Sequence, residues 1–267
     1  MLPEAFAPAF MQKAFLAGAL SASALSIVGV FIVLKRMSNI GEGLSNVAFA
    51  GLALGILFGA APLPLAFAAT VVGVLLIQHI SDKGIVFGET AVQIMCAGGF
   101  ALGVVVVSMS SGFNVNLLEY LFGSILSVSD SDIVTIAALA ASTLIAVAYS
   151  WRQLTYTVFD EDSAQAAGLP TKRLNLLLMM IAAASIVAGM RIVGILLVSS
   201  MLVVPAAAAI AVARSFRQTV ALSAGFAVSS VLIGLTAAFY LNVAAGGAVV
   251  LVQVLMFFAA AYLGERL

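Results

Sequence analysis

Apolar runs of roughly 20 residues recur along the whole chain and are separated by short polar stretches. A helix of about 20 apolar residues is long enough to cross the hydrocarbon layer of a bilayer. The runs predict spanning helices at residues 14–34, 39–59, 63–80, 89–109, 132–150, 174–190, 192–212, 219–240 and 246–263. Arg191 alone separates the sixth run from the seventh, so the pattern predicts eight or nine crossings.

The composition also indicates a membrane protein. Of the 267 residues, 64% are hydrophobic and 8% are charged, whereas a soluble domain carries about 25% charged residues. We therefore expect an all-α polytopic membrane protein with a single transmembrane domain over residues 1–267. The formal net charge of zero gives no indication of nucleic-acid binding, and the only cysteine, Cys96, is interpreted as a small packing residue.

The basic residues predict how the chain is oriented in the membrane. With nine crossings and the N-terminus outside, nine of the eleven Lys and Arg residues fall in cytoplasmic loops, as the positive-inside rule requires. The nine are Lys35, Arg36, Lys83, Arg152, Lys172, Arg173, Arg214, Arg217 and Arg266. Only Lys13 and Arg191 then lie outside, so we expect an extracytoplasmic N-terminus.

The longest predicted cytoplasmic connection, residues 151–173, contains a short helix signal. Asp160, Glu161 and Asp162 precede a run of good helix formers, and the sequence Gly168-Leu169-Pro170 then predicts the end of the helix. Acidic residues in a first turn are favoured by the helix dipole. The pattern predicts a short amphipathic helix along the membrane surface, either an ordinary loop helix or a coupling helix that docks in a groove of a cytosolic ATPase.

The stretch RMSNIGEGLSNVAFAG, residues 36–51, places a carboxylate and an amide at the start of a predicted spanning helix. Glu42 and Asn46 are four residues apart, so they share one helix face. A carboxylate at this depth needs water, a cation or a polar partner. Either Glu42 snorkels or caps the helix while Asn46 bonds a neighbouring helix, or both line a translocation path, as is common at glycine-interrupted helix starts in transporters.

For other polar residues in apolar surroundings, the sequence gives weaker indications of a role in ion binding or partner contact. Residues 114–126 are too few to span and are expected to form a re-entrant or interfacial helix. Glu119 in this segment, with Asp130 and Asp132 after it, could attract a cation, contact a delivery protein or simply face water. The single histidine, His79, is interpreted as interfacial, and Glu89 as a carboxylate placed for the helix dipole.

Several motifs resemble the membrane subunit of the zinc/manganese/iron ABC importers. The pattern D-x-D-x-A-x-x-x-G-L, at Asp160, Asp162, Ala164, Gly168 and Leu169, is similar to the loop with which importer permeases contact their ATPase. Residues 29–51, 89–108, 116–132 and 191–209 and the tail GGAVVLVQVLMFFAAAYL resemble the family in the same order. The resemblance implies a paired permease, two cytosolic ABC ATPases that bind ATP and Mg, and an extracytoplasmic metal-binding protein. This chain has no Walker A motif and is expected to bind no cofactor itself.

The resemblance also assigns a role to Glu42 and Asn46. In this family the matching motif usually reads G-D-x-x-[SA]-H, and its Asp and His are membrane metal ligands. Glu42 retains a carboxylate, whereas Asn46 offers an amide oxygen in place of an imidazole nitrogen. Oxygen donors favour Mn, Mg or Ca over zinc. The segment EYLFGSILSVS nevertheless looks closer to the zinc-type members, so both an oxygen-based waypoint for a divalent ion and a changed cargo remain open.

We therefore expect a non-enzymatic permease of a binding-protein-dependent importer for a divalent transition metal, zinc or manganese first. Two such chains would bring two Glu42 and two Asn46 side chains together. The expected location is a bacterial or archaeal plasma membrane. The competing hypothesis is an ATP-independent secondary transporter or channel, which the scarcity of intramembrane charges disfavours.

Overall fold

The computed structural model describes residues 8–84, 86–109, 121–123 and 130–264. In this part of the chain, nine helices are long and apolar enough to cross a membrane, which confirms the predicted all-α polytopic architecture. The helices are α2 (Ala9–Leu34), α3 (Asn39–Leu57), α4 (Pro62–Asp82), α5 (Gly88–Met109), α7 (Asp130–Phe159), α8 (Glu161–Ala166), α9 (Thr171–Val193), α10 (Ile195–Val212), α11 (Phe216–Leu241) and α12 (Ala245–Gly264). Of these described helices, α8 alone is too short to span.

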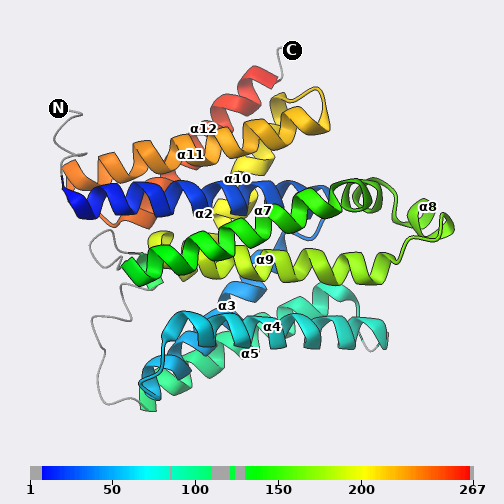
Figure 1. Cartoon of the computed structure of the whole chain (residues 1–267), viewed down its shortest axis with the longest axis horizontal. Coiled ribbons are helices and arrows are strands. Elements are labelled where there is room, and N and C mark those ends of the chain that lie inside the picture. Colours follow the sequence, from blue (N-terminus) through cyan, green and yellow to red (C-terminus); the bar gives the residue numbers. More distant parts are fainter. Residues whose placement is uncertain (1–7, 85, 110–120, 124–129, 265–267) are drawn as a thin grey trace.

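Helix α2 runs through the middle of the bundle, where it packs against α7, α9, α10 and α11 (Figure 1). Helices α4 and α5 lie on one side and both pack against α3, whereas α11 and α12 lie on the opposite side and pack against α10. Helices α3 and α9 are the most enclosed of these spans, because 72% of the residues in the apolar stretch of each helix are buried inside the protein. Helix α3, which carries Glu42 and Asn46, is therefore held between α5 and α10 near the centre of the molecule.

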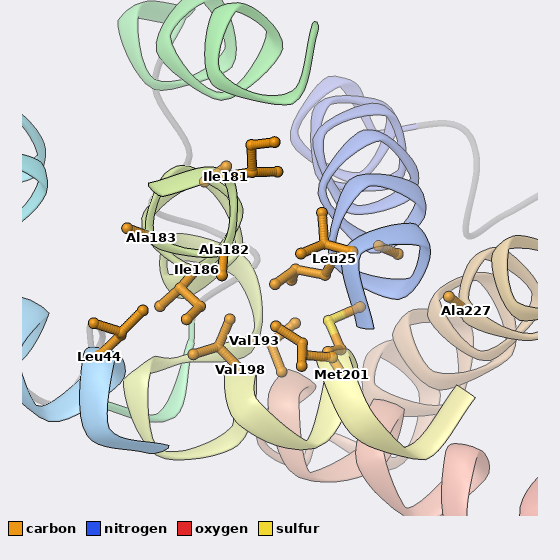
Figure 2. Close-up of a cluster of buried hydrophobic side chains, with 14 of the residues drawn as sticks. Leu25, Leu44, Ile181, Ala182, Ala183, Ile186, Val193, Val198, Met201 and Ala227 are labelled. Atoms are coloured by element: carbon orange, nitrogen blue, oxygen red, sulfur yellow. The ribbon is translucent and has the colours of Figure 1, made fainter. Parts of the chain in front are cut away.

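Interlocking apolar side chains from α2, α3, α9, α10 and α11 form the core (Figure 2). Leu25, Ile186, Val198 and Met201 meet there, and each is fully buried. In lipid such contacts stabilise the bundle through van der Waals packing. The outward face of α7 instead exposes large apolar side chains such as Val134 and Ile145, as expected for a surface in contact with acyl chains.

The structure corrects several predicted helix boundaries. The first span was expected to begin at residue 14, but α2 begins at Ala9. The fifth span was expected to end at residue 150, but α7 continues to Phe159. Residues 151–159 contain no helix breaker, and Leu154 and Thr157 within them are buried. The sixth and seventh spans were expected to divide at Arg191, which instead lies within α9. They divide at Gly194, whose φ of 93° is accessible chiefly to glycine. A side chain at Gly194 would also place its Cβ 2.4 Å from the Leu121 carbonyl oxygen.

Most of the predicted re-entrant segment, residues 114–126, lies outside the described residues, and so does Glu119. The described part, residues 121–123, packs against the bundle. Leu121 contacts a buried cluster that includes Ala48 and Leu52 of α3, and the segment's backbone lies against Gly194 and Gly246.

Candidate functional site

A cavity of about 410 Å³ lies beside the first two turns of α3. Three helices contribute its lining: Glu42, Ser45 and Asn46 come from α3, Phe100 from α5, and Ile195, Leu196 and Ser199 from α10. Glu42 is exposed and Asn46 is half-buried, so both side chains can reach an ion in the cavity. The structure thus places the two residues singled out from the sequence in one pocket.

The amide of Asn46 is held from one side by α5. Its Nδ2 donates a hydrogen bond to the Cys96 sulfur across 2.9 Å. Because the nitrogen is used in this way, the Oδ1 carbonyl is the atom that the amide can offer to a cation. The expectation that Cys96 only fills space is therefore incomplete, because its half-buried sulfur also orients a pocket residue.

The polar groups around the cavity are mainly oxygen donors. Besides the Glu42 carboxylate and the Asn46 carbonyl, the hydroxyls of Ser45 and Ser199 lie in the lining. Ser45 Oγ donates its proton to the Gly41 carbonyl across 2.6 Å, so the lone pairs of this oxygen are what the hydroxyl can offer to a cation. Hard oxygen donors suit Mn, Mg and Ca better than zinc. Among the described residues, no three His, Cys, Asp or Glu side chains group closely enough to hold a metal ion.

Close contact between α3 and α5 sets this geometry. A Cβ at Gly99 would lie 2.8 Å from the Val47 nitrogen and 2.9 Å from the Asn46 carbonyl carbon. Only glycine therefore lets the α5 backbone touch α3 at the pocket. Cys96 lies three residues before Gly99, so the same contact brings its sulfur to Asn46.

We predict that Gly99→Ala will lower the thermal denaturation midpoint of the purified protein by roughly 3–10 °C, because the added methyl overpacks a backbone contact. Transport should fall as well, since the change displaces Asn46. Gly98→Ala is the matched control, because a Cβ there meets no atom within 4 Å. Equal denaturation midpoints for the two variants, measured in detergent, would show that the close approach is not needed.

The second predicted site, helix α8, projects from one end of the bundle between α7 and α9 (Figure 1). Asp160 caps it: the Ser163 backbone N–H donates to Oδ1 across 2.9 Å, and the Ser163 hydroxyl donates to Oδ2 across 2.5 Å. These hydrogen bonds hold the pKa of Asp160 below its usual range. The predicted start of the helix is confirmed, with Glu161 and Asp162 in its first turn.

The inner face and the end of α8 also agree with the predicted pattern. Ala164 is fully buried and faces the bundle, whereas Asp162 is exposed. Gly168 has a φ of 83°, and the Leu169 N–H returns to the Ala164 carbonyl across 3.0 Å. This is the glycine-terminated geometry common at helix ends. Asp160, Asp162, Gly168 and Leu169 thus belong to one compact segment that the buried Ala164 holds against the bundle, and its docking role stays a prediction.

The remaining polar candidates lie away from the pocket lining. His79 is exposed in the last turn of α4. Glu89 is exposed in the first turn of α5 and lines a separate cavity of about 310 Å³ with Lys35, Arg36 and Asn39. Phe100, Ser199 and the orienting Cys96 were missed from the sequence, because they belong to α5 and α10 and meet α3 only in the folded bundle. The one available signal was their position within motifs that resemble the importer family.

Comparisons with known proteins cover nearly the whole chain. The sequence model of the ABC 3 transport family matches residues 7–264. The manganese transport system membrane protein MntC of Halalkalibacterium halodurans is 30% identical over 257 residues, which cover 96% of this chain and 88% of MntC. A probable metal transport system membrane protein of Treponema pallidum is 32% identical over 249 residues, 93% of each chain.

A solved structure agrees with the sequence comparisons. PsaBC from Streptococcus pneumoniae, determined in complex with Fab, contains a chain that matches with a TM-score of 0.88 and 30% identity. The match covers 97% of this chain and 95% of that one. The structural match therefore spans nearly the whole length of both chains.

Proposed function

The chain belongs to the ABC 3 transport family, and from this premise we propose that it is the permease through which a binding-protein-dependent importer moves Mn²⁺. It is a membrane-spanning transport subunit of a metal-ion ABC importer and not an enzyme. Manganese is the cargo that we favour, and zinc is the alternative that the experiment below distinguishes.

The observation that carries the proposal is the oxygen-rich pocket at Glu42 and Asn46. The carboxylate supplies the negative charge that a divalent cation requires, and the amide and hydroxyl oxygens complete a set of hard donors. Such donors favour Mn²⁺ over Zn²⁺, which imidazole and thiolate ligands suit better. Relatives from Halalkalibacterium halodurans and Streptococcus gordonii are named as manganese transport proteins, which supports the same cargo.

A second permease copy would complete the site. The described part of one chain offers a single carboxylate and a single amide to the cavity, whereas a Mn²⁺ ion prefers about six oxygen ligands. Two chains related by a two-fold axis would present two Glu42 and two Asn46 side chains to one ion. The exposure of Glu42 on the single chain supports this arrangement, because the carboxylate is accessible to a partner.

The driving energy would come from another chain. This sequence contains no Walker A motif, so a cytosolic ABC ATPase would hydrolyse ATP with Mg²⁺, and an extracytoplasmic binding protein would deliver the ion. Helix α8, with Asp160, Asp162, Ala164, Gly168 and Leu169, is the proposed docking element. The distribution of basic residues supports an N-terminus outside a bacterial or archaeal plasma membrane, with α8 inside.

The proposal can be tested by reconstituting the permease in liposomes with its ATPase and binding protein. We expect ATP-dependent uptake of radiolabelled Mn²⁺ that exceeds uptake of Zn²⁺. Preferential uptake of Zn²⁺ would identify zinc, and not manganese, as the transported ion. Uptake that persists without ATP or the ATPase would favour a secondary transporter.

Asp160→Ala should weaken docking of the ATPase, because it removes the acceptor for the Ser163 N–H and frays the start of α8. We expect the amount of ATPase that co-purifies with the permease to fall roughly threefold to tenfold. Asp160→Ser is the matched control, since serine caps helices well. Equal recovery of the ATPase with both variants would argue that a formed α8 is not required for docking.

A further inference from the structure

A largely buried lysine connects α8 to a part of the bundle distant in sequence. The Nζ atom of Lys35, at the end of α2, donates to Glu161 Oε2 across 2.9 Å and also to Asn175 Oδ1. Asn175 in turn donates from Nδ2 to Glu161 Oε1 across 2.8 Å. Each of the three side chains therefore bonds to the other two, and together they join α2, α8 and α9.

Within this Lys35–Glu161–Asn175 triangle, the positive charge of Lys35 and the negative charge of Glu161 stabilise each other. The Lys35 side chain is only 10% exposed, whereas that of Glu161 is 43% exposed. Burial raises the pKa of the Glu161 carboxyl, but the hydrogen bonds from Lys35 and Asn175 lower this pKa by more, so the net shift is downward. Glu161 is thus ionised at neutral pH and provides the charge-assisted partner that the enclosed ammonium needs.

Lys35 lies at the start of a tightly closed turn that leads directly into α3. The Arg36 N–H bonds to the Val33 carbonyl and the Met37 N–H to the Ile32 carbonyl, each across 3.0 Å. Arg36 takes the left-handed conformation with a φ of 61°. This is the double hydrogen bond of a Schellman turn. Because the turn is closed in this way, a displacement of Lys35 moves the first residues of α3, and Glu42 follows seven residues after Lys35.

We propose that the Lys35–Glu161–Asn175 triangle is the link by which movement of α8 reaches Glu42, with Lys35 and Glu161 as positioning residues. This inference rests on the proposed role of α8 as the docking element. The backbone of α8 packs against α7 and α9, its neighbours in the chain. The ion pair of Lys35 with Glu161 also connects α8 to α2 and, through the closed turn, to α3, the helix that bears Glu42 and Asn46.

Another ion pair on the chain provides a matched control. Lys172 Nζ lies 3.2 Å from Asp82 Oδ1 and joins the start of α9 to the end of α4. Its side chains are 74% and 39% exposed, so the pair is largely solvated. Solvated ion pairs contribute little to an interaction between helices. Removing this pair changes charge close to α9 without touching the triangle or α8.

The test compares Mn²⁺ ions moved per ATP hydrolysed in the reconstituted complex of permease, ATPase and binding protein. Lys35→Met and Glu161→Gln should each assemble with the ATPase and hydrolyse ATP, while the number of ions moved per ATP falls about tenfold. Lys35→Arg, which keeps the charge and donors, should retain at least half of the wild-type ratio. Asp82→Asn should leave the ratio unchanged.

The inference is overturned if Glu161→Gln transports with the wild-type ratio, and also if Asp82→Asn lowers the ratio as strongly as Glu161→Gln. Glu161 is the deciding position if Lys35→Met fails to assemble, because its side chain is exposed enough to tolerate replacement. Failure of the proposed function would be visible separately, as an absence of ATP-driven Mn²⁺ uptake by the wild-type complex.

Discussion

Glu42→Gln is expected to abolish ATP-driven Mn²⁺ uptake while leaving the permease folded and bound to its ATPase. The substitution keeps the size of the side chain and removes the only carboxylate that the described residues contribute to the pocket lining. Loss of a charged ligand weakens ion binding by about 3 kcal/mol, which corresponds to roughly 100-fold in affinity. Because Glu42 is exposed, the change in stability should stay within about 0.5 kcal/mol.

The control for this variant is Glu89→Gln. Glu89 is also an exposed carboxylate in the first turn of a spanning helix, but it lines the separate cavity of about 310 Å³. Its replacement should leave uptake close to the wild-type rate. Normal uptake by Glu42→Gln would return Glu42 to the role of a snorkelling or capping carboxylate, and equal loss in both variants would remove the specificity claimed for the pocket.

Asn46→His should change which metal the permease handles. An imidazole in place of the amide adds a nitrogen ligand that zinc prefers. We expect Zn²⁺ to inhibit Mn²⁺ uptake at concentrations about tenfold lower than for the wild type, because a single ligand change typically shifts metal affinity by about that factor or more. The measurement is a competition curve of labelled Mn²⁺ uptake against Zn²⁺.

Asn46→Asp controls for a change in shape and charge, since it adds a hard oxygen ligand without an imidazole. It should leave the sensitivity to zinc unchanged or reduce it. If the competition curves of wild type, Asn46→His and Asn46→Asp coincide, Asn46 is not a contact of the transported ion.

The spans and α8 could be predicted from local sequence, because their physical causes are local. Continuous apolar runs define the spans, and the acids at 160–162 with Gly168 define a helix start and stop. The prediction failed at Phe159 and Gly194 for a different reason. The polar composition of residues 151–159 suggested a loop, whereas tertiary contacts that bury Leu154 keep the segment helical. The break at Gly194 lies in close contact with residues 121–123, which are distant in the sequence.

The same distinction applies to the site. Glu42 and Asn46 could be recognised together, because helical spacing alone puts them on one face. Ser199 and Cys96 could not, because Ser199 joins the lining and Cys96 meets Asn46 only through the contacts of α3 with α10 and α5. Lys35 and Glu161 are 126 residues apart. In the sequence they read as a basic loop residue and a first-turn acid, with no sign that they form a pair.

The ion site at Glu42 and Asn46 can be observed directly in an anomalous difference map, recorded at the manganese absorption edge, from crystals of the assembled permease soaked in Mn²⁺. One peak is expected between two permease copies, in contact with both Glu42 carboxylates and both Asn46 amide oxygens, and no such peak is expected in Glu42→Gln. A manganese peak elsewhere in the membrane region with an empty Glu42 pocket would contradict this assignment.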